Sequence, residues 1–344
     1  MYELLRTNKR LWELFTKKEE YGSNALDDFD RFPPSSSKSQ NYAEPEVSRF
    51  LFENGYRSRY PDGKKFALCL THDIDQLTSS FLTGLLHRLR SPKYIEKTAH
   101  KVMSKVIPLK NFSEMMNLEE QYGGKSSFYF LALPEESENS TYDIEEISNE
   151  MKEITERGWE VGLHGSLEAY NDLSLMTREK EKIERALGKK VIGYRNHFLR
   201  FKIPTTWELI RLAGFKYDTT FGYNCKVGFR NGMCHPFFPF NLETNRPIDI
   251  LEIPMAAQDA FYGSIIGFDL NGAWETMKAL IDETERYNGV ITVLWHNTRM
   301  TGDSLRLYKK VLSYSLGKNA WIASAEEIYR WWVDSGFKTK YSEH

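Results

Sequence analysis

Four of the eight histidines stand at or just after the end of an apolar run that predicts a β-strand. They are His72, His164, His197 and His296, and two aspartates, Asp73 and Asp75, accompany the first of them. Imidazole and carboxylate groups are the side chains that commonly bind zinc and transfer protons near neutral pH. Because the ends of successive strands can converge on one pocket, this distribution predicts a metal site or an acid–base site.

The first cluster is the strand end at residues 70–75, where two carboxylates lie two positions apart. Residues i and i+2 of an extended chain point the same way, so Asp73 and Asp75 can reach one centre. One of them would then bind a metal while the other acts as a base. The alternative is that the two aspartates cap a helix that starts near Leu77.

The other three strand ends add further chemistry. His164 is followed by two small residues that permit close approach of a ligand. Arg195 could hold a carboxylate in a bidentate grip, and His197 could face the same pocket. His296 suits a general acid because the pKa of imidazole lies near neutrality. Substrate-binding residues are expected beside these positions and in a later aromatic loop: Tyr194, Asn196, Trp295 and Tyr223.

Short apolar runs alternate with amphipathic helices from residue 66 onwards, which is typical of an α/β layer or barrel. The predicted strands are Phe66–Thr71, Ser127–Leu133, Trp159–His164, Val191–Tyr194, Phe215–Tyr217, Ile248–Pro254, Gly289–Trp295 and Trp321–Ala323. The last helix is expected to begin with a capping box from Ser324 to Glu327. Two architectures fit this pattern, a closed (β/α) barrel or an open doubly wound sheet. Nucleotide-binding versions of the open sheet lose support because no glycine-rich phosphate motif follows the first strand.

The composition is that of a globular protein. Of 344 residues, 41% are hydrophobic and 27% charged, and 46 Lys and Arg against 48 Asp and Glu leave a net charge of −2. This balance argues against a general nucleic-acid or anionic-membrane binder. Three cysteines are too few for a disulfide framework, and no uncharged run is long enough to span a membrane. The first residues carry no secretory signal pattern, so we expect a cytoplasmic protein.

The chain is expected to contain an N-terminal arm and linker at residues 1–65, a barrel at residues 66–335 and a C-terminal tail at residues 336–344. The arm begins with a short amphipathic stretch and continues into charge-rich and Pro/Ser-rich sequence. Residues 221–240, between two predicted strands, form an aromatic loop rich in Gly and Pro. This loop is either a wall of a substrate groove or a hydrophobic plug that closes the barrel.

In their order and spacing, these motifs resemble the polysaccharide deacetylases of carbohydrate esterase family 4, which contain the NodB homology domain. The matching segments are Thr71-His72-Asp73-Ile74-Asp75, His164-Gly165-Ser166, Tyr194-Arg195-Asn196-His197-Phe198, Tyr217-Asp218, Leu251-Glu252-Ile253-Pro254 and Leu294-Trp295-His296. The resemblance covers roughly residues 66–335, and each motif would be weak alone. It implies a distorted (β/α) barrel of about seven parallel strands. It also implies removal of acetyl groups from N-acetylated sugars, with a divalent metal held by one Asp and two His.

The resemblance implies roles for individual residues as well. Asp73 corresponds to the catalytic base, Asp75 to the metal-binding carboxylate and His164 to the first histidine ligand. Arg195 corresponds to the residue that orients the base, and His296 to the acid that protonates the departing amine. The implied metal is divalent, with Zn²⁺ as the preferred candidate. Such a metal polarises the acetamide carbonyl and lowers the pKa of a bound water.

Two positions depart from the family pattern. Asp73 and Asp75 are separated by one residue where the family usually has adjacent aspartates, as in a divergent THDxD-type branch, so their roles could be exchanged. The second histidine of the family's H-x-x-x-H motif falls on Glu168. Either Glu168 binds the metal or another residue replaces the histidine, with His197 the preferred replacement and His72 the next. The last alternative is that no metal binds tightly.

We therefore expect a metal-dependent deacetylase that hydrolyses the acetamide of an N-acetylated sugar in surface-polysaccharide or cell-envelope metabolism. A carbohydrate is the expected partner, nucleic acid is not, and the oligomeric state stays open. One rival within the same fold is an amide hydrolase with a non-sugar substrate. Another is a catalytically silent barrel that binds glycan or a biosynthetic partner, which Glu168 at a ligand position would favour.

Overall fold

The computed structural model describes residues 1–77, 110–133, 141–261 and 269–335. Its centre is a sheet of parallel strands in the order β8-β5-β4-β3-β2-β1-β10-β9, and β11 also pairs with β1. The strands are β1 (Phe66–Ile74), β2 (Ser127–Leu131), β3 (Glu160–Gly165), β4 (Gly193–Asn196), β5 (Tyr217–Asp218), β8 (Leu251–Glu252), β9 (Met255–Gln258), β10 (Val290–Leu294) and β11 (Ala320–Ala323). Every residue of β1, β2, β3 and β10 is buried, as expected for parallel strands covered on both faces.

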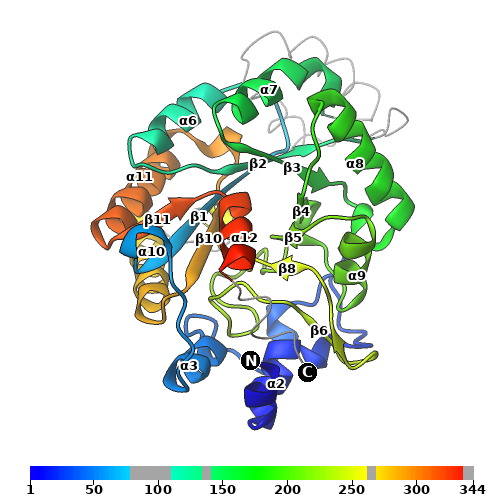
Figure 1. Cartoon of the computed structure of the whole chain (residues 1–344), viewed down its shortest axis with the longest axis vertical. Helices are drawn as coiled ribbons and strands as arrows, with labels where there is room; N and C mark the ends of the chain where they lie inside the picture. Colours follow the sequence, from blue (N-terminus) through cyan, green and yellow to red (C-terminus); the bar gives the residue numbers. More distant parts are fainter. Residues whose placement is uncertain (78–109, 134–140, 262–268, 336–344) are drawn as a thin grey trace.

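The sheet curls into a barrel, and its two edge strands are directly connected in the sequence. β8 and β9 lie at opposite ends of the strand order, yet only Ile253 and Pro254 separate them in the sequence. Helices surround the curl (Figure 1). The predicted distorted (β/α) barrel is confirmed, with eight strands around the curl in the described residues rather than about seven. The sequence pattern missed β9, because its residues Met-Ala-Ala-Gln include no β-branched or aromatic side chain.

The helices that accompany the strands each bury an apolar side. They are α6 (Phe112–Glu120), α7 (Ser148–Glu156), α8 (Leu173–Leu187), α9 (Thr205–Leu212), α10 (Leu270–Arg286), α11 (Gly302–Gly317) and α12 (Ala325–Asp334). The predicted capping box of α12 is confirmed, since Ser324 and Glu327 each accept the other's backbone N–H. Glu160, the first residue of β3, accepts the backbone N–H of Glu326 at 2.9 Å. The start of α12 therefore sits at the amino-terminal end of the barrel strands, near the middle of the view in Figure 1.

The N-terminal residues pack against the aromatic loop. The elements involved are α1 (Tyr2–Arg6), α2 (Lys9–Thr16), α3 (Glu46–Glu53) and the antiparallel pair β6 (Phe240–Asn241) and β7 (Arg246–Pro247). The ring of Phe15 meets that of Phe237 at 5.3 Å, and Glu20 forms a buried ion pair with Arg230 at 2.6 Å. Figure 1 shows α2 and β6 side by side at the lower end of the molecule. The aromatic loop is thus buried beneath the N-terminal segment, which favours the plug interpretation, while the domain boundary at residue 65 stays a prediction.

Two buried carboxyl groups lie on the side of the sheet that is covered by α9. Asp218 of β5 and Glu252 of β8 are register partners on neighbouring strands, and neither side chain is exposed. Burial, reinforced by Asp218, raises the pKa of Glu252 well above its ordinary value. Trp207 donates to one oxygen of Glu252 at 2.8 Å, and Thr220 donates to Asp218. The protonated Glu252 can therefore donate to Asp218 and keep the pair together.

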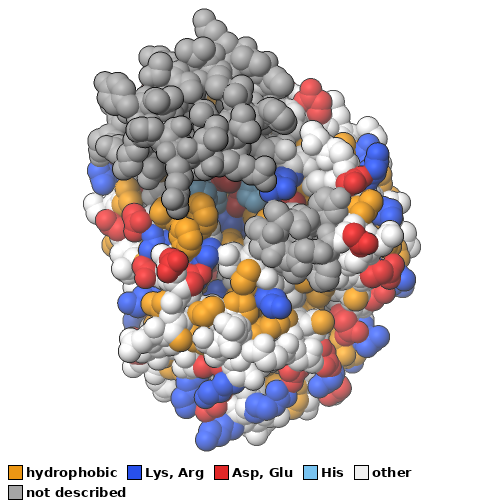
Figure 2. Space-filling view, turned by 180° about the vertical axis from the view of Figure 1, so that it is seen from behind, with side chains coloured by type: hydrophobic (Ala, Val, Ile, Leu, Met, Phe, Trp, Pro, Cys, Tyr) orange, Lys and Arg blue, Asp and Glu red, His pale blue; other side chains and the backbone are white. Residues whose placement is uncertain are grey.

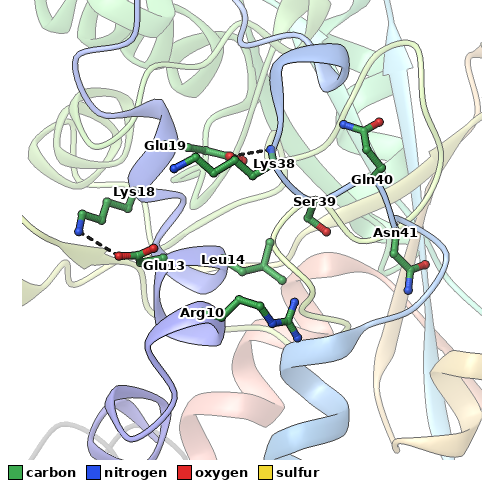
Figure 3. Close-up of a pocket in the computed structure, with 9 residues that line it drawn as sticks. All are labelled: Arg10, Glu13, Leu14, Lys18, Glu19, Lys38, Ser39, Gln40 and Asn41. Carbon is green, nitrogen blue, oxygen red and sulfur yellow. Dashed lines mark hydrogen bonds and ion pairs between the residues drawn. The ribbon is translucent and has the colours of Figure 1, made fainter.

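A cavity of about 540 Å³ opens between α2 and residues 38–41 (Figure 3). No residue of the barrel strands lines it. Several of its charged groups form ion pairs: Lys18 pairs with Glu13 at 3.0 Å and Arg10 with Glu46 at 2.6 Å. The cavity belongs to the N-terminal segment and is separate from the predicted catalytic residues.

The remaining expectations concern one helix, the C-terminal tail, the cysteines and membrane-spanning segments. The helix expected from Leu77 and the tail at residues 336–344 lie outside the described residues. The three cysteines are free thiols, in agreement with the prediction that they form no disulfide framework. Among the helices of the described residues, none has the length and apolar character needed to cross a bilayer.

Candidate active site

The predicted chemical residues gather at the carboxyl ends of the parallel strands. Asp73 and Asp75 come from the end of β1, and His164 lies on β3. His197 and His296 follow β4 and β10. Figure 2 shows histidine and acidic surfaces together in a hollow on this face of the molecule. Because neighbouring parallel strands end at the same edge, residues far apart in the sequence reach a single place.

Three of these side chains come close enough to hold one metal ion. The ligand atoms of Asp75, His164 and His197 all lie within 4.8 Å of one another. Oδ1 of Asp75 is 3.2 Å from Nε2 of His164 and 3.6 Å from Nε2 of His197. Two atoms bound to zinc at about 2.1 Å in a tetrahedral arrangement lie about 3.4 Å apart, so these separations fit a single cation.

The surroundings leave the same ligand atoms available. Oδ1 of Asp75 and Nε2 of His164 are buried and, apart from each other, have no hydrogen-bond partner among the described residues. The other ring nitrogen of His164, Nδ1, is 3.1 Å from the backbone oxygen of Arg195 and can donate to it. That hydrogen bond selects the tautomer in which Nε2 offers its lone pair, as is usual for metal-binding histidines. One Asp and two His form a donor set that zinc and similar divalent metals accept, so the residues fit the implied metal.

The charges of the cluster are strongly coupled. Burial would raise the pKa of Asp75, but the close approach of His164 and the charge of His296 hold that pKa below its usual range. Burial would lower the pKa of His164, but Asp73 and Asp75 outweigh it and the net shift is upward. Burial and the neighbouring His164 lower the pKa of His197 to about 4. A divalent cation and the proton on His164 therefore compete for one negatively charged cluster.

Asp73 lies beside the cluster and next to a fixed arginine. Its Oδ2 is 3.7 Å from Nε2 of His164, and its Oδ1 is 3.7 Å from Nη1 of Arg195. Arg195 is fully buried and donates to the hydroxyl oxygens of Thr71 and Thr219 at 2.9 and 3.0 Å. These hydrogen bonds fix the guanidinium group where it can orient the carboxylate of Asp73.

His296 pairs with Asp259, a residue that the sequence reasoning missed. Nδ1 of His296 lies 2.9 Å from one oxygen of Asp259, and the backbone N–H of His296 donates to the other at 2.7 Å. Burial would lower the pKa of His296, but the buried Asp259 raises it to about 10. Nε2 of His296 lies 3.5 Å from Asp75, so a proton on it faces the cluster. Asp259 directly follows β9, the strand that the sequence pattern did not reveal.

The two other candidates for the third ligand lie elsewhere. Glu168 has 66% of its side chain exposed and pairs with Arg200 at 2.8 Å. His72 is fully buried, and its ring nitrogens contact a backbone oxygen at 2.6 Å and the carboxylate of Glu119 at 2.7 Å. Of the three candidates named from the sequence, the structure brings His197 into the cluster and leaves Glu168 and His72 out of it.

The residues expected to bind substrate are buried. Tyr194 and Asn196 have no exposed surface, and the hydroxyl of Tyr194 donates to the side chain of Asn196 at 2.5 Å. Trp295 is also fully buried and donates to a serine of α11 at 2.9 Å. Tyr223 is 5% exposed and packs against a tyrosine of the N-terminal segment. Along β4, successive side chains point to opposite faces, so Tyr194 and Asn196 point away from the face that carries Arg195.

No family model and no curated protein sequence matches this chain. Solved structures do match it. A protein from Mycobacterium smegmatis described as a polysaccharide deacetylase is 17% identical, with a TM-score of 0.56 over 79% of this chain and 92% of its own. A protein from Pseudomonas aeruginosa PAO1 described in the same way is 12% identical, with a TM-score of 0.57 over 84% of this chain and 97% of its own. PuuE allantoinase is 14% identical, with a TM-score of 0.57 over 84% of this chain and 96% of its own.

At 12–17% identity, these likenesses concern the fold. They cover 79–84% of this chain, whose curled parallel sheet carries the Asp and His cluster at its carboxyl end. The resemblance in the sequence motifs and the likeness in three dimensions agree. The chain has the NodB-like fold of the polysaccharide deacetylases.

Proposed function

We propose that this protein is a metal-dependent deacetylase that hydrolyses the acetamide of an N-acetylated sugar in surface-polysaccharide or cell-envelope metabolism. The observation that carries the proposal is the convergence of Asp75, His164 and His197 beside Asp73 and His296 at the strand ends. Amide hydrolysis needs an electrophilic centre for the carbonyl, a base for water and an acid for the amine. This cluster offers one residue set for each task.

The roles follow from position. Asp75, His164 and His197 would hold the metal, which when bound polarises a carbonyl and lowers the pKa of water. Asp73, oriented by Arg195, would accept the proton of the attacking water.

The departing nitrogen needs a proton. His296 would supply it, because Asp259 keeps its imidazole protonated and fixes the ring through two contacts. After transfer, the ring can be reprotonated from solvent, since 19% of its side chain is exposed. Asp73 contacts the cluster at His164 and His296 contacts it at Asp75, so the proposed base and acid are separate groups beside the same cluster.

Metal content and acetate release test this function together. Protein purified without chelator or nickel affinity resin should carry a near-stoichiometric divalent metal, and His164→Ala should lose it. Acetate release from N-acetylglucosamine oligomers should fall by about 10²–10⁴-fold in Asp73→Asn and in His296→Ala. Glu168→Gln is the matched control, because its side chain is exposed and outside the cluster. Unchanged deacetylation in both variants would contradict the proposal.

A second candidate is amide hydrolysis on a non-sugar substrate. It is favoured by the likeness to PuuE allantoinase, which is as close in fold as the two deacetylase structures. Both candidates use the same site residues, so variants do not separate them. Substrate profiling does: release of acetate from acetylated sugars supports the first, and hydrolysis restricted to small cyclic or linear amides supports the second.

The alternative of a catalytically silent barrel rests on Glu168 at the place of a ligand histidine. It loses support because the imidazole of His197 lies in the cluster instead. Glycan affinity without metal and without product would restore this alternative.

A further inference from the structure

His197 lies on a turn that its own sequence does not favour. It begins the 3₁₀ turn η6 (His197–Leu199), in which Phe198 and Leu199 have φ angles of 58° and 54°. Residues with bulky side chains rarely adopt this left-handed backbone conformation, and two in succession do so where surrounding contacts hold them. By contrast, His164 lies within β3 and is positioned by the sheet. The contacts that hold the turn therefore bear on where His197 can reach.

Those contacts come from the N-terminal segment Asp27–Arg31, about 170 residues away in the sequence. Arg31 donates from Nη1 to the backbone oxygen of Phe198 at 2.8 Å. The ring of Phe29 stacks on that of Phe198, with centroids 5.0 Å apart and an interplanar angle of 9°. Phe198 in turn contacts the ring of His197 at 4.6 Å. A continuous set of contacts thus joins the segment to the ligand.

The segment is itself firmly folded. The carboxylate of Asp27 accepts the backbone N–H groups of Phe29 and Arg31 at 2.9 and 3.0 Å, and the Arg31 guanidinium at 2.8 Å. Arg200, which is 6% exposed, donates to the backbone oxygen of Phe29 at 2.9 Å and to Asp30 at 2.7 Å. Arg31 keeps only 12% of its side chain exposed. A loop with this many internal bonds can fix the position of what it contacts.

We propose that the segment Asp27–Arg31 is a support of the metal site, which holds the turn of residues 197–199 where His197 can bind the metal. This inference rests on the metal site proposed above and adds to it a part of the chain outside the barrel. Arg31 and Phe29 are positioning residues, because they act on the backbone and ring of the turn and not on the metal. Loss of groups that orient a metal ligand typically weakens metal binding by about 10–100-fold.

The test is the Zn²⁺ affinity of the full chain, measured by competition with a chelator. We expect Arg31→Ala and Phe29→Ala to bind Zn²⁺ about 10–100-fold more weakly than the wild type. Arg31→Lys should fall between, since an ammonium can replace one contact of the guanidinium but not both. The matched control is Arg10→Ala. Arg10 lies on α2, has one ion pair and lines the cavity in Figure 3, so this variant should bind Zn²⁺ as the wild type does.

Melting curves of the metal-free variants separate positioning from loss of folding. The inference predicts weaker binding in Arg31→Ala and Phe29→Ala while their melting temperatures stay close to that of Arg10→Ala. Wild-type affinity in both variants, or an equal loss in the control, would overturn the support role and leave the proposed function standing. A wild-type protein that binds no Zn²⁺ would overturn the ligand set first and this inference with it.

Discussion

Replacing Asp259 by Asn should move the basic limb of the pH–rate profile to lower pH. His296 acts as an acid only while protonated, and Asp259, 2.9 Å from Nδ1, is the main group that raises its pKa. At an effective dielectric constant of about 20, unit charges at this distance attract by about 6 kcal/mol, an upper limit of roughly 4 pH units. Single opposite charges in proteins shift a pKa by about 1–3 units. We therefore expect the pKa that defines the basic limb of kcat/KM to decrease by about 1–3 units.

The shape of the pH–rate profile distinguishes loss of the negative charge of Asp259 from poorer orientation of His296. Asn keeps one oxygen, so it can satisfy only one of the two N–H groups of His296 that Asp259 now accepts. Poorer orientation lowers the rate at every pH, whereas loss of the negative charge moves the limb itself. Glu168→Gln is the control, because it also removes a carboxylate, but one that pairs with Arg200 and not with His296.

The assay is acetate release from an N-acetylated oligosaccharide, followed as kcat/KM between about pH 5 and 11 so that the basic limb of the wild type falls inside the range. A basic limb that stays in place in Asp259→Asn would refute the reasoning, since it would show that His296 is not the acid or that Asp259 does not set its charge. A limb that moves equally in the Glu168 control would refute it as well.

Three further outcomes can be checked. Zn²⁺ affinity, measured by chelator competition, should rise with pH through neutrality, because His164 has a raised pKa and must lose its proton to bind the metal. Glu119→Ala should cost about 3–5 kcal/mol in urea unfolding because it leaves His72 buried without its carboxylate, whereas the exposed neighbour Glu120→Ala should change little. Glu252 has a folded pKa raised above its unfolded value, so its contribution to stability is full below about pH 4 and declines as pH rises; Glu252→Gln should flatten the melting temperature between about pH 5 and 8.

The strand ends that carry the Asp and His cluster could be predicted because two signals coincide there. Buried parallel strands are apolar along their whole length, so a His or Asp at the end of such a run stands out. Asp75, His164 and His197 were named as candidate ligands in this way, and the structure brings their ligand atoms within 4.8 Å of one another. The choice of His197 over Glu168 could not be derived from spacing alone, since both lie near the ends of neighbouring strands.

Other parts of the site could not be read from local pattern. Asp259 was missed because β9 is rich in alanine and gives no strand signal, although its neighbour β10 does. Tyr194 and Asn196 were expected at the substrate, but they alternate with Arg195 along β4 and therefore face away from it. The sequence indicated which strand end these two residues occupy, but it did not indicate which face of the sheet their side chains lie on.

The third ligand and the N-terminal segment are best understood together. In the pattern that the sequence resembles, the second histidine stands four residues after the first, where this chain has Glu168, which turns outward to Arg200. The second imidazole comes instead from His197, on a turn whose left-handed backbone needs outside support. A ligand on a strained turn is useful only if that turn is held, and Arg31 supplies a hydrogen bond at that place. With His197 as the proposed ligand, the need to hold its turn accounts for the contact between residues before the barrel and the Asp and His cluster.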